Sequence, residues 1–278
     1  MLSVNRIGAM VACVAALVGT DPACAETRVV SINLCTDQLL LSLARPEQIL
    51  SLSWLASDPE ESVLAAEART YPFNYGTAEE VLALGPDLVL AGSYTSTFTR
   101  SVLKRLGFHV HEIEPAQRIE DIEQNLREVA GLIEAEQRAE ALIREFRGRL
   151  ARLAAPEDTR RVAFLRPGGF TIERASLANA LIERVGIRNV AAEDGLDRWG
   201  SLPMETLVRA SPDVIAILSY QSTTPSLANS ILDHPALRAA VATRTVHVPT
   251  RYWACGLPQS LDAVELLLDA LASTRVDE

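Results

Sequence analysis

The sequence has 278 residues, of which 48% are hydrophobic and 22% charged, and its formal net charge is −10 at pH 7. This composition predicts a globular protein of one large or two modest domains. Because no basic stripe offsets the acidic balance, the charge argues against a nucleic-acid binder and against binding to anionic membrane surfaces.

Residues 1–25 have the pattern of a cleaved secretory signal peptide. Arg6 supplies the positive charge, residues 7–19 form an apolar run, and Ala23-Cys24-Ala25 resembles a cleavage site. The apolar run is shorter than the roughly 20 residues of a membrane span. Asp21 stands where a lipoprotein anchored at Cys24 would have an aliphatic residue. We therefore expect a mature chain that begins at Glu26 and is exported without an anchor.

Residues 26–134 alternate between β-rich and helical segments, which predicts a first lobe of parallel strands joined by right-handed crossovers. The expected strands cover residues 28–33, 49–52, 87–91 and 108–113. The expected helices cover residues 37–44, 60–68, 78–84, 101–107 and 119–133.

Residues 135–155 are predicted to form one long helix. Ala139, Ile143, Phe146 and Leu150 recur every three or four residues and so form one apolar stripe. About 20 residues at about 1.5 Å each span roughly 30 Å, the diameter of a small domain. We interpret this helix as a rigid connection between two lobes, and the alternative is an ordinary packed helix within one domain.

Residues 156–278 repeat the alternation and predict a second lobe. The expected strands cover residues 161–165, 189–191, 213–218 and 245–248, and the expected helices cover residues 177–185, 204–210, 231–240 and 260–272.

An internal repeat relates the two lobes. The run AEEVLALGPDLVL at residues 78–90 aligns without a gap with METLVRASPDVIA at residues 204–216, so that Glu79 matches Glu205 at a distance of 126 residues. Each copy reads as a short helix, a Pro-Asp turn and a buried strand. The long period indicates two related domains and not a solenoid. The predicted fold is therefore α/β, with two doubly wound parallel-sheet lobes joined by a single long α-helix.

The sequence has no phosphate-binding loop, no nucleophile elbow and no H-E-x-x-H zinc motif. His109 and His111 share one face of an expected strand, but no third ligand stands nearby, and a solvated strand face explains them. His234 and His247 are also interpreted as structural. We therefore predict no catalytic residue, no metal site made by the protein alone and no cofactor.

The aromatic residues are more informative, because every Tyr and Trp falls in a predicted loop. In a doubly wound sheet, ligands bind at the carboxyl ends of the strands. If the two lobes face each other across these ends, the rings line a shared cleft suited to a large flat ligand. The alternative is that Tyr and Trp occupy loops because they tolerate half-burial. The rings that follow strands are those of Trp54, Tyr94, Tyr220, Tyr252 and Trp253.

The run RVVSINLCTD at residues 28–37, the two repeat copies and the central helix together resemble the periplasmic iron-complex and cobalamin binding proteins, the substrate-binding components of ABC importers. The resemblance covers essentially the whole mature chain. It implies a monomeric, non-enzymatic protein that captures a metal chelate or corrinoid and delivers it to an ABC permease dimer with its ATPase. The chelates of this family include ferric siderophores, haem and cobalamin, so that iron or cobalt would arrive within the ligand.

The resemblance also implies roles for individual residues. Glu79 and Glu205 match the glutamates with which the cobalamin-binding member docks on its permease, although each is also explained as an acid favoured by the dipole of its helix. Phe73 matches an aromatic residue that stacks on the ligand. The chain departs from the family at Leu34 and Cys35, where many members have proline, and in the run WACGLP at residues 253–258.

Two further pairs of residues are candidates for the cleft. Cys35 and Cys255 each follow an expected strand, one in each lobe, and export permits a disulfide between them. The alternatives are two free buried thiols or a thiolate that contacts the ligand's metal. Arg166 and Arg251 follow second-lobe strands, where a guanidinium would pair with a carboxylate or phosphate of the ligand. Alternatively, Arg166 caps its loop and Arg251 is solvated.

Two other classes of function remain as alternatives. One is a periplasmic two-domain α/β enzyme, which needs a nucleophile or base constellation that the sequence does not show. The other is a ligand sensor that signals without transport.

Overall fold

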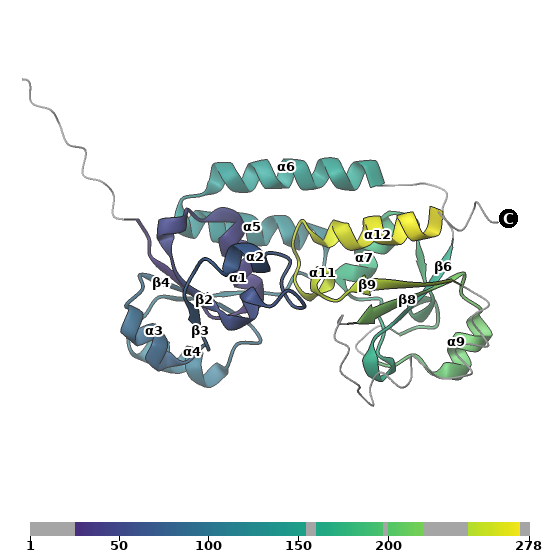
Figure 1. Ribbon diagram of the computed structural model, residues 1–278, viewed down its shortest axis with the longest axis horizontal. Helices are drawn as coiled ribbons and strands as arrows, with labels where there is room; N and C mark the ends of the chain where they lie inside the picture. The colour runs from purple at the N-terminus through teal and green to yellow at the C-terminus, as the bar shows by residue number, and fades with distance from the viewer. Residues whose placement is uncertain (1–25, 154–159, 197–199, 220–243, 273–278) are drawn as a thin grey trace, which may run out of the picture.

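The computed structural model describes residues 26–153, 160–196, 200–219 and 244–272. It confirms the predicted fold class: two parallel sheets, each covered by helices, lie side by side under one long helix (Figure 1). The signal peptide, Tyr220, Trp199 and the helix expected at residues 231–240 lie outside the described residues.

The N-terminal lobe is built on a five-stranded sheet in the order β3-β2-β1-β4-β5. Its strands are β1 (Val29–Ser31), β2 (Ile49–Ser53), β3 (Phe73–Asn74), β4 (Leu88–Gly92) and β5 (Val110–Ile113). Its helices are α1 (Leu34–Leu43), α2 (Ala65–Ala68), α3 (Ala78–Leu84), α4 (Thr97–Arg105) and α5 (Ile119–Ile133), with 3-10 turns at Pro46–Gln48 and Trp54–Ser57.

In the C-terminal lobe the described strands pair in the order β7-β6-β8-β9. They are β6 (Arg161–Leu165), β7 (Arg188–Asn189), β8 (Val214–Ser219) and β9 (Arg244–Pro249). The described helices are α6 (Glu136–Leu153), which leads into the lobe, α7 (Leu177–Arg184), α8 (Val190–Glu193), α9 (Met204–Ala210), α11 (Arg251–Ala254) and α12 (Ser260–Ala272), with a 3-10 turn at Pro167–Gly169.

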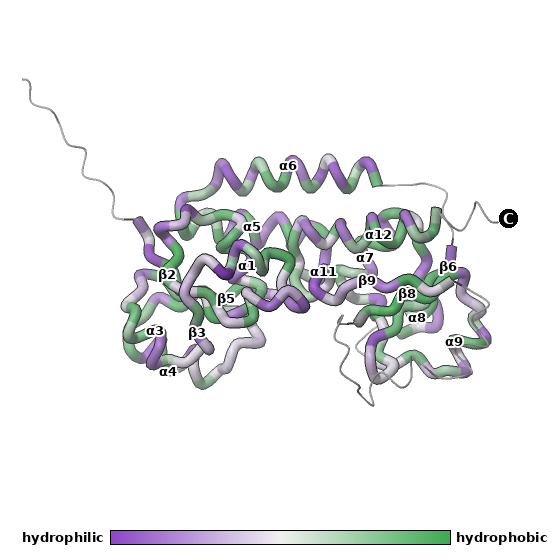
Figure 2. The backbone as a smooth tube through the Cα atoms, in the orientation of Figure 1, coloured by the Kyte–Doolittle hydropathy of each residue, from purple (hydrophilic) through white to green (hydrophobic). Residues whose placement is uncertain are grey.

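Buried side chains occupy both faces of each sheet, as a doubly wound fold requires. On the lower face in Figure 1, Val81 of α3 packs with Val30 and Val89 in one lobe, and Leu207 of α9 packs with Ile215 in the other. On the upper face, one cluster includes residues of both lobes and of α5, α6 and α12. Figure 2 shows the hydrophobic strands of both sheets and the alternation of polar and apolar residues along α6. The two lobes therefore share a continuous core beneath α6.

Helix α6 is held to both lobes by ion pairs. Arg147 donates through Nε and Nη2 to Glu123 of α5 at 2.7 and 2.5 Å. Arg149 donates to Asp262 and Glu265 of α12 at 2.6 and 2.9 Å. The pKa of Glu123 lies below its ordinary value, chiefly because of the hydrogen bond from Arg147. These contacts fix the direction of the long helix across the molecule.

The internal repeat is visible in three dimensions. Each repeat helix ends in a left-handed residue, Gly85 with φ 55° or Ser211 with φ 45°. In each Pro-Asp turn, the aspartate accepts a hydrogen bond from a backbone N–H at the start of the first strand of its lobe: Arg28, just before β1, donates to Asp87 at 2.9 Å, and Arg161, the first residue of β6, donates to Asp213 at 2.7 Å. The same turn and the same hydrogen bond therefore orient α3 and α9 against their sheets.

Several sequence-based expectations are wrong in detail. Residues 189–191 were expected to form a strand, but β7 ends at Asn189 because its side chain caps α8, accepting from Ala191 N at 3.1 Å. The helix expected over residues 60–68 is reduced to Ala65–Ala68, and the short strand β3 was not predicted. Tyr252 and Trp253 lie in helix α11 and not in a loop.

Candidate ligand-binding cleft

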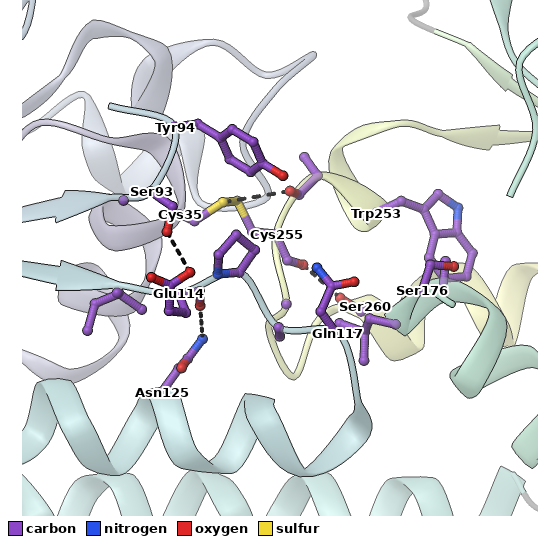
Figure 3. Close-up of a pocket in the computed structure, with 18 of the residues that line it drawn as sticks. Cys35, Ser93, Tyr94, Glu114, Gln117, Asn125, Ser176, Trp253, Cys255 and Ser260 are labelled. Atoms are coloured by element: carbon purple, nitrogen blue, oxygen red, sulfur yellow. Dashed lines mark hydrogen bonds between the residues drawn. A yellow bond between two sulfur atoms is a disulfide. The ribbon is translucent and has the colours of Figure 1, made fainter. Parts of the chain in front are cut away.

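A cavity of about 220 Å³ lies between the two lobes (Figure 3). Its walls come from segments that follow β1, β4 and β5 in the N-terminal lobe and from segments that follow β6 and β9 in the C-terminal lobe. These are the carboxyl ends of parallel strands, where ligands bind in open α/β sheets. The cavity therefore lies where the sequence predicts a shared cleft.

The N-terminal wall begins at Asn33, whose side chain caps α1 by accepting a hydrogen bond from Cys35 N at 3.0 Å. Gly92 ends β4 directly beside it: a methyl group added at Gly92 would lie 2.9 Å from Asn33 Cγ. Glycine is therefore required for this close approach. Tyr94 follows on the next turn, and its side chain is 87% exposed at the cavity edge.

The connection between β5 and α5 adds polar groups to the cavity. Ser93 Oγ donates to Glu114 Oε2 at 2.7 Å, and Asn125 Nδ2 of α5 donates to the backbone oxygen of Glu114 at 3.0 Å (Figure 3). Ala116 and Gln117 complete this part of the lining. These two hydrogen bonds hold the connection between β5 and α5 to the segment after β4 and to α5 itself.

The C-terminal wall contains Arg166, which follows β6, and Trp253 of α11, together with Glu173 and Ser176 before α7. The cavity therefore combines two aromatic side chains, Tyr94 and Trp253, with one guanidinium and the carboxyl groups of Glu114 and Glu173. Such a lining favours an amphipathic ligand that offers both a flat apolar face and polar groups at its edge.

A disulfide joins the lobes within the cavity lining. Cys35 at the start of α1 and Cys255 after α11 are bonded, with their Cα atoms 5.3 Å apart and 220 residues between them in the sequence. The sequence left open a disulfide, two free thiols or a thiolate on the ligand's metal, and the structure contains the disulfide.

Other predicted ligand residues do not line this cavity. Trp54 follows β2, and Phe73 is the first residue of β3, paired with Leu52 of β2. The two residues are 46% and 43% exposed, and Trp54 contacts Tyr75 with ring centroids 6.5 Å apart. Arg251 Nη1 donates to Pro59 O at 3.2 Å, and its guanidinium lies 5.0 Å from the ring centre of Tyr252. Arg251, Tyr252 and Trp253 all belong to the short helix α11. Within this one turn, Trp253 lines the cavity and Arg251 contacts the N-terminal lobe.

The polar lining around Glu114, Asn125, Glu173 and Ser176 was not predicted from the sequence. Glu114 follows β5 directly, so the rule that ligands bind at carboxyl strand ends identifies it once the strand is recognised. Asn125 and Ser176 carry no such signal, because their placement depends on how α5 and α7 meet between the lobes.

Behind the wall, Asp37 of α1 is fully buried and accepts a hydrogen bond from Ser53 N at 3.1 Å, with Ser53 Oγ also bonded to it. Burial raises the pKa of Asp37 to about 7, since the charged form loses its hydration. His111 contacts Glu128 at 2.7 Å, and the described residues contain no group of three or more potential metal ligands.

Glu79 and Glu205 lie away from the cavity, each exposed as the second residue of its helix, α3 or α9. Both helices lie on the side of the sheets opposite α6 (Figure 1). The next residue, Glu80, has a different role, because it accepts hydrogen bonds from Tyr75 N and Thr77 N and so caps α3.

Comparisons with known proteins define the class. The model of the periplasmic binding protein family matches residues 29–250, so the chain belongs to that family. A cobalamin-binding protein of Halobacterium salinarum is 26% identical over 198 residues, which make up 68% of this chain and 53% of that protein. The chain thus spans about half the length of this curated relative.

Solved structures share the fold at low identity. The periplasmic heme-binding protein RhuT from Roseiflexus sp. RS-1, in apo form, is 22% identical with a TM-score of 0.71, over 88% of this chain and 97% of that chain. The periplasmic heme-binding protein HutB of Vibrio cholerae is 19% identical with a TM-score of 0.73, over 86% and 97% respectively. Within the residues that the structure describes, no helix is both long enough and apolar enough to cross a bilayer.

Proposed function

We propose that this protein captures a metal chelate or corrinoid in the cleft between its lobes and delivers it to an ABC import permease. The observation that carries the proposal is the cavity itself, which is lined by Tyr94 of the N-terminal lobe and by Arg166 and Trp253 of the C-terminal lobe. The named relatives, which bind cobalamin or heme, support the same class of ligand.

The size of the cavity constrains how such a ligand binds. Its volume of about 220 Å³ is below the roughly 300–1,000 Å³ of pockets that enclose a drug-sized ligand. A chelate or corrinoid would therefore insert one edge into the cavity and leave the rest between the lobes. In this proposal the remainder would contact the exposed rings of Trp54, which follows β2, and Phe73, which pairs with Leu52 of β2.

The side chains that line the cavity suit the binding of a ligand and not a chemical reaction on it. Arg166 offers a guanidinium that pairs bidentately with a carboxylate or phosphate at the ligand edge, while Tyr94 and Trp253 offer ring faces. The protein needs no cofactor of its own in this function, because iron or cobalt arrives inside the ligand. Export through the signal peptide expected at residues 1–25 would place it in the periplasm.

Delivery is assigned to the surface that carries Glu79 and Glu205. The repeat places one glutamate at the same point of each lobe, which suits a partner made of two equivalent subunits with a basic site on each. The partner in this proposal is the permease dimer of an ABC importer.

Native mass spectrometry tests the proposal on protein purified from its own periplasm. We expect a bound species with the mass of a chelate or corrinoid, together with a Soret band if that species is haem. Protein that carries Tyr94→Ala and Trp253→Ala should lose the bound species and serves as the control. Recovery of a sugar or an amino acid in stoichiometric amount would contradict the proposal.

A further inference from the structure

Helix α11 and the turn that follows it belong to the C-terminal lobe by sequence, between β9 and α12, but they contact the N-terminal lobe. Arg251 Nη1 donates to Pro59 O at 3.2 Å, and Cys255 is bonded to Cys35, whose Sγ also lies 3.6 Å from Ala254 O. We call residues 251–256 the clamp segment. Its contacts across the cleft make it part of both lobes.

The backbone of the clamp segment comes close to the N-terminal lobe at Gly256. A methyl group built at this position would overlap the methyl group of Ala116 and would lie 3.0 Å from Leu177 Cδ2. Ala116 belongs to the connection between β5 and α5, so glycine is what allows the clamp segment to lie directly on the N-terminal lobe.

The clamp segment is also a wall of the cavity. Trp253, Ala254, Cys255 and Gly256 all line it, together with Cys35 and Ala116 of the N-terminal lobe. Helix α11 has only four residues, and a single turn of helix has little stability of its own. The position of Trp253 at the cavity therefore depends on what holds the clamp segment in place.

We propose that the Cys35–Cys255 disulfide is a positioning element of the ligand site, so that its redox state sets the affinity for the ligand. The inference rests on the proposed function. A dithiol reductant would break the S–S bond, leave two thiols at Cys35 and Cys255, and itself become a disulfide. The clamp segment would then keep only non-covalent contacts, among them the Arg251 hydrogen bond, the Cys35–Ala254 contact and the packing at Gly256.

The effect of reduction is local. The buried cluster shared by α5, α6, α12 and both sheets holds the lobes together independently of the disulfide. Cleavage of the bond therefore loosens the clamp segment and its Trp253 without separating the lobes. A local effect of this kind distinguishes a positioning role from a purely structural one. If the role were purely structural, reduction would lower the protection of backbone amides from hydrogen exchange throughout the molecule.

Hydrogen exchange of the mature protein without ligand provides the first test. Incubation with dithiothreitol should increase exchange in residues 250–257 and leave α6 and the sheets protected. The variant C35S/C255S should show the increased exchange without reductant and should not respond to it. Unchanged exchange in residues 250–257 on reduction would overturn the inference whatever the ligand is.

The second test is affinity, measured with haemin and cyanocobalamin as probes. Whichever probe binds the oxidised protein should bind the reduced protein and C35S/C255S at least about tenfold more weakly, and reoxidation of the wild-type protein should restore the affinity. Equal affinity in both redox states would overturn the inference. If neither these probes nor a ferric siderophore binds the oxidised protein, the proposed function fails, while the exchange result still decides whether the disulfide positions the segment.

Discussion

Glu79 and Glu205 occupy equivalent positions in the two lobes: each is the exposed second residue of a seven-residue helix, followed by a Pro-Asp turn and a buried strand. The equivalence comes from the internal repeat. It places two like charges on one side of the molecule, at a spacing fixed by the shared core beneath α6.

We expect E79K/E205K to abolish delivery and leave ligand capture intact. The permease would meet two positive charges in place of two negative ones, and breaking desolvated charge pairs at an interface typically costs about 2–5 kcal/mol. Binding to the permease in nanodiscs and uptake by cells measure the loss. The variant E136K/E145K, with the same change of charge on α6, should dock and transport normally. Undiminished uptake by E79K/E205K would remove the docking role.

The two rings of the cavity should dominate ligand affinity. Truncation of a buried aromatic anchor often costs about 2 kcal/mol or more, so Tyr94→Ala and Trp253→Ala should each weaken binding by about 30-fold. Phe98→Ala is the matched control, because Phe98 is 73% exposed on α4 and does not line the cavity. If Phe98→Ala weakens binding as much as the other two variants, the ligand lies elsewhere.

Much of this architecture follows from the sequence. Period-3.6 and period-2 apolar patterns identify the elements, and the repeat with its Pro-Asp turns identifies two related lobes. The cavity wall is less predictable, because it depends on contacts between distant segments. Nothing near Trp253 in the sequence shows that a single helical turn will place it at the cavity, and nothing near Trp54 shows that η2 (Trp54–Ser57) leaves it outside.

Asp37 should make stability depend on pH. Its pKa is raised from 3.8 to about 7 in the folded protein, so its stabilising contribution is complete below pH 3.8 and is lost as the pH rises through 7. Between pH 5 and 8 this loss amounts to about 2–3 kcal/mol.

The variant D37N isolates this contribution, because its amide can accept from Ser53 N and donate to Ser53 Oγ without titrating. Urea unfolding at pH 5 and pH 8 should show that the wild-type protein loses more stability than D37N by that amount. Identical pH dependence of the two proteins would mean that Asp37 titrates normally.

Gly256 should be intolerant of any side chain. In Gly256→Ala the new methyl group overlaps that of Ala116, and overpacking of this kind costs about 1–3 kcal/mol. Gly131→Ala provides the contrast: it lies in α5 with nothing within 4 Å of the added methyl group, so it should be neutral or slightly stabilising. Thermal unfolding of both variants makes the comparison, and equal stability would show that the clamp segment does not lie directly on Ala116.

Isothermal titration calorimetry of the oxidised mature protein with haemin, cyanocobalamin and a ferric siderophore tests the central claim most directly. We predict saturable binding of at least one of these ligands, with affinity that falls in Tyr94→Ala and Trp253→Ala. Absence of binding to all three, together with tight binding of a free metal ion or a simple sugar, would contradict the assignment of the interlobe cleft to a metal chelate or corrinoid.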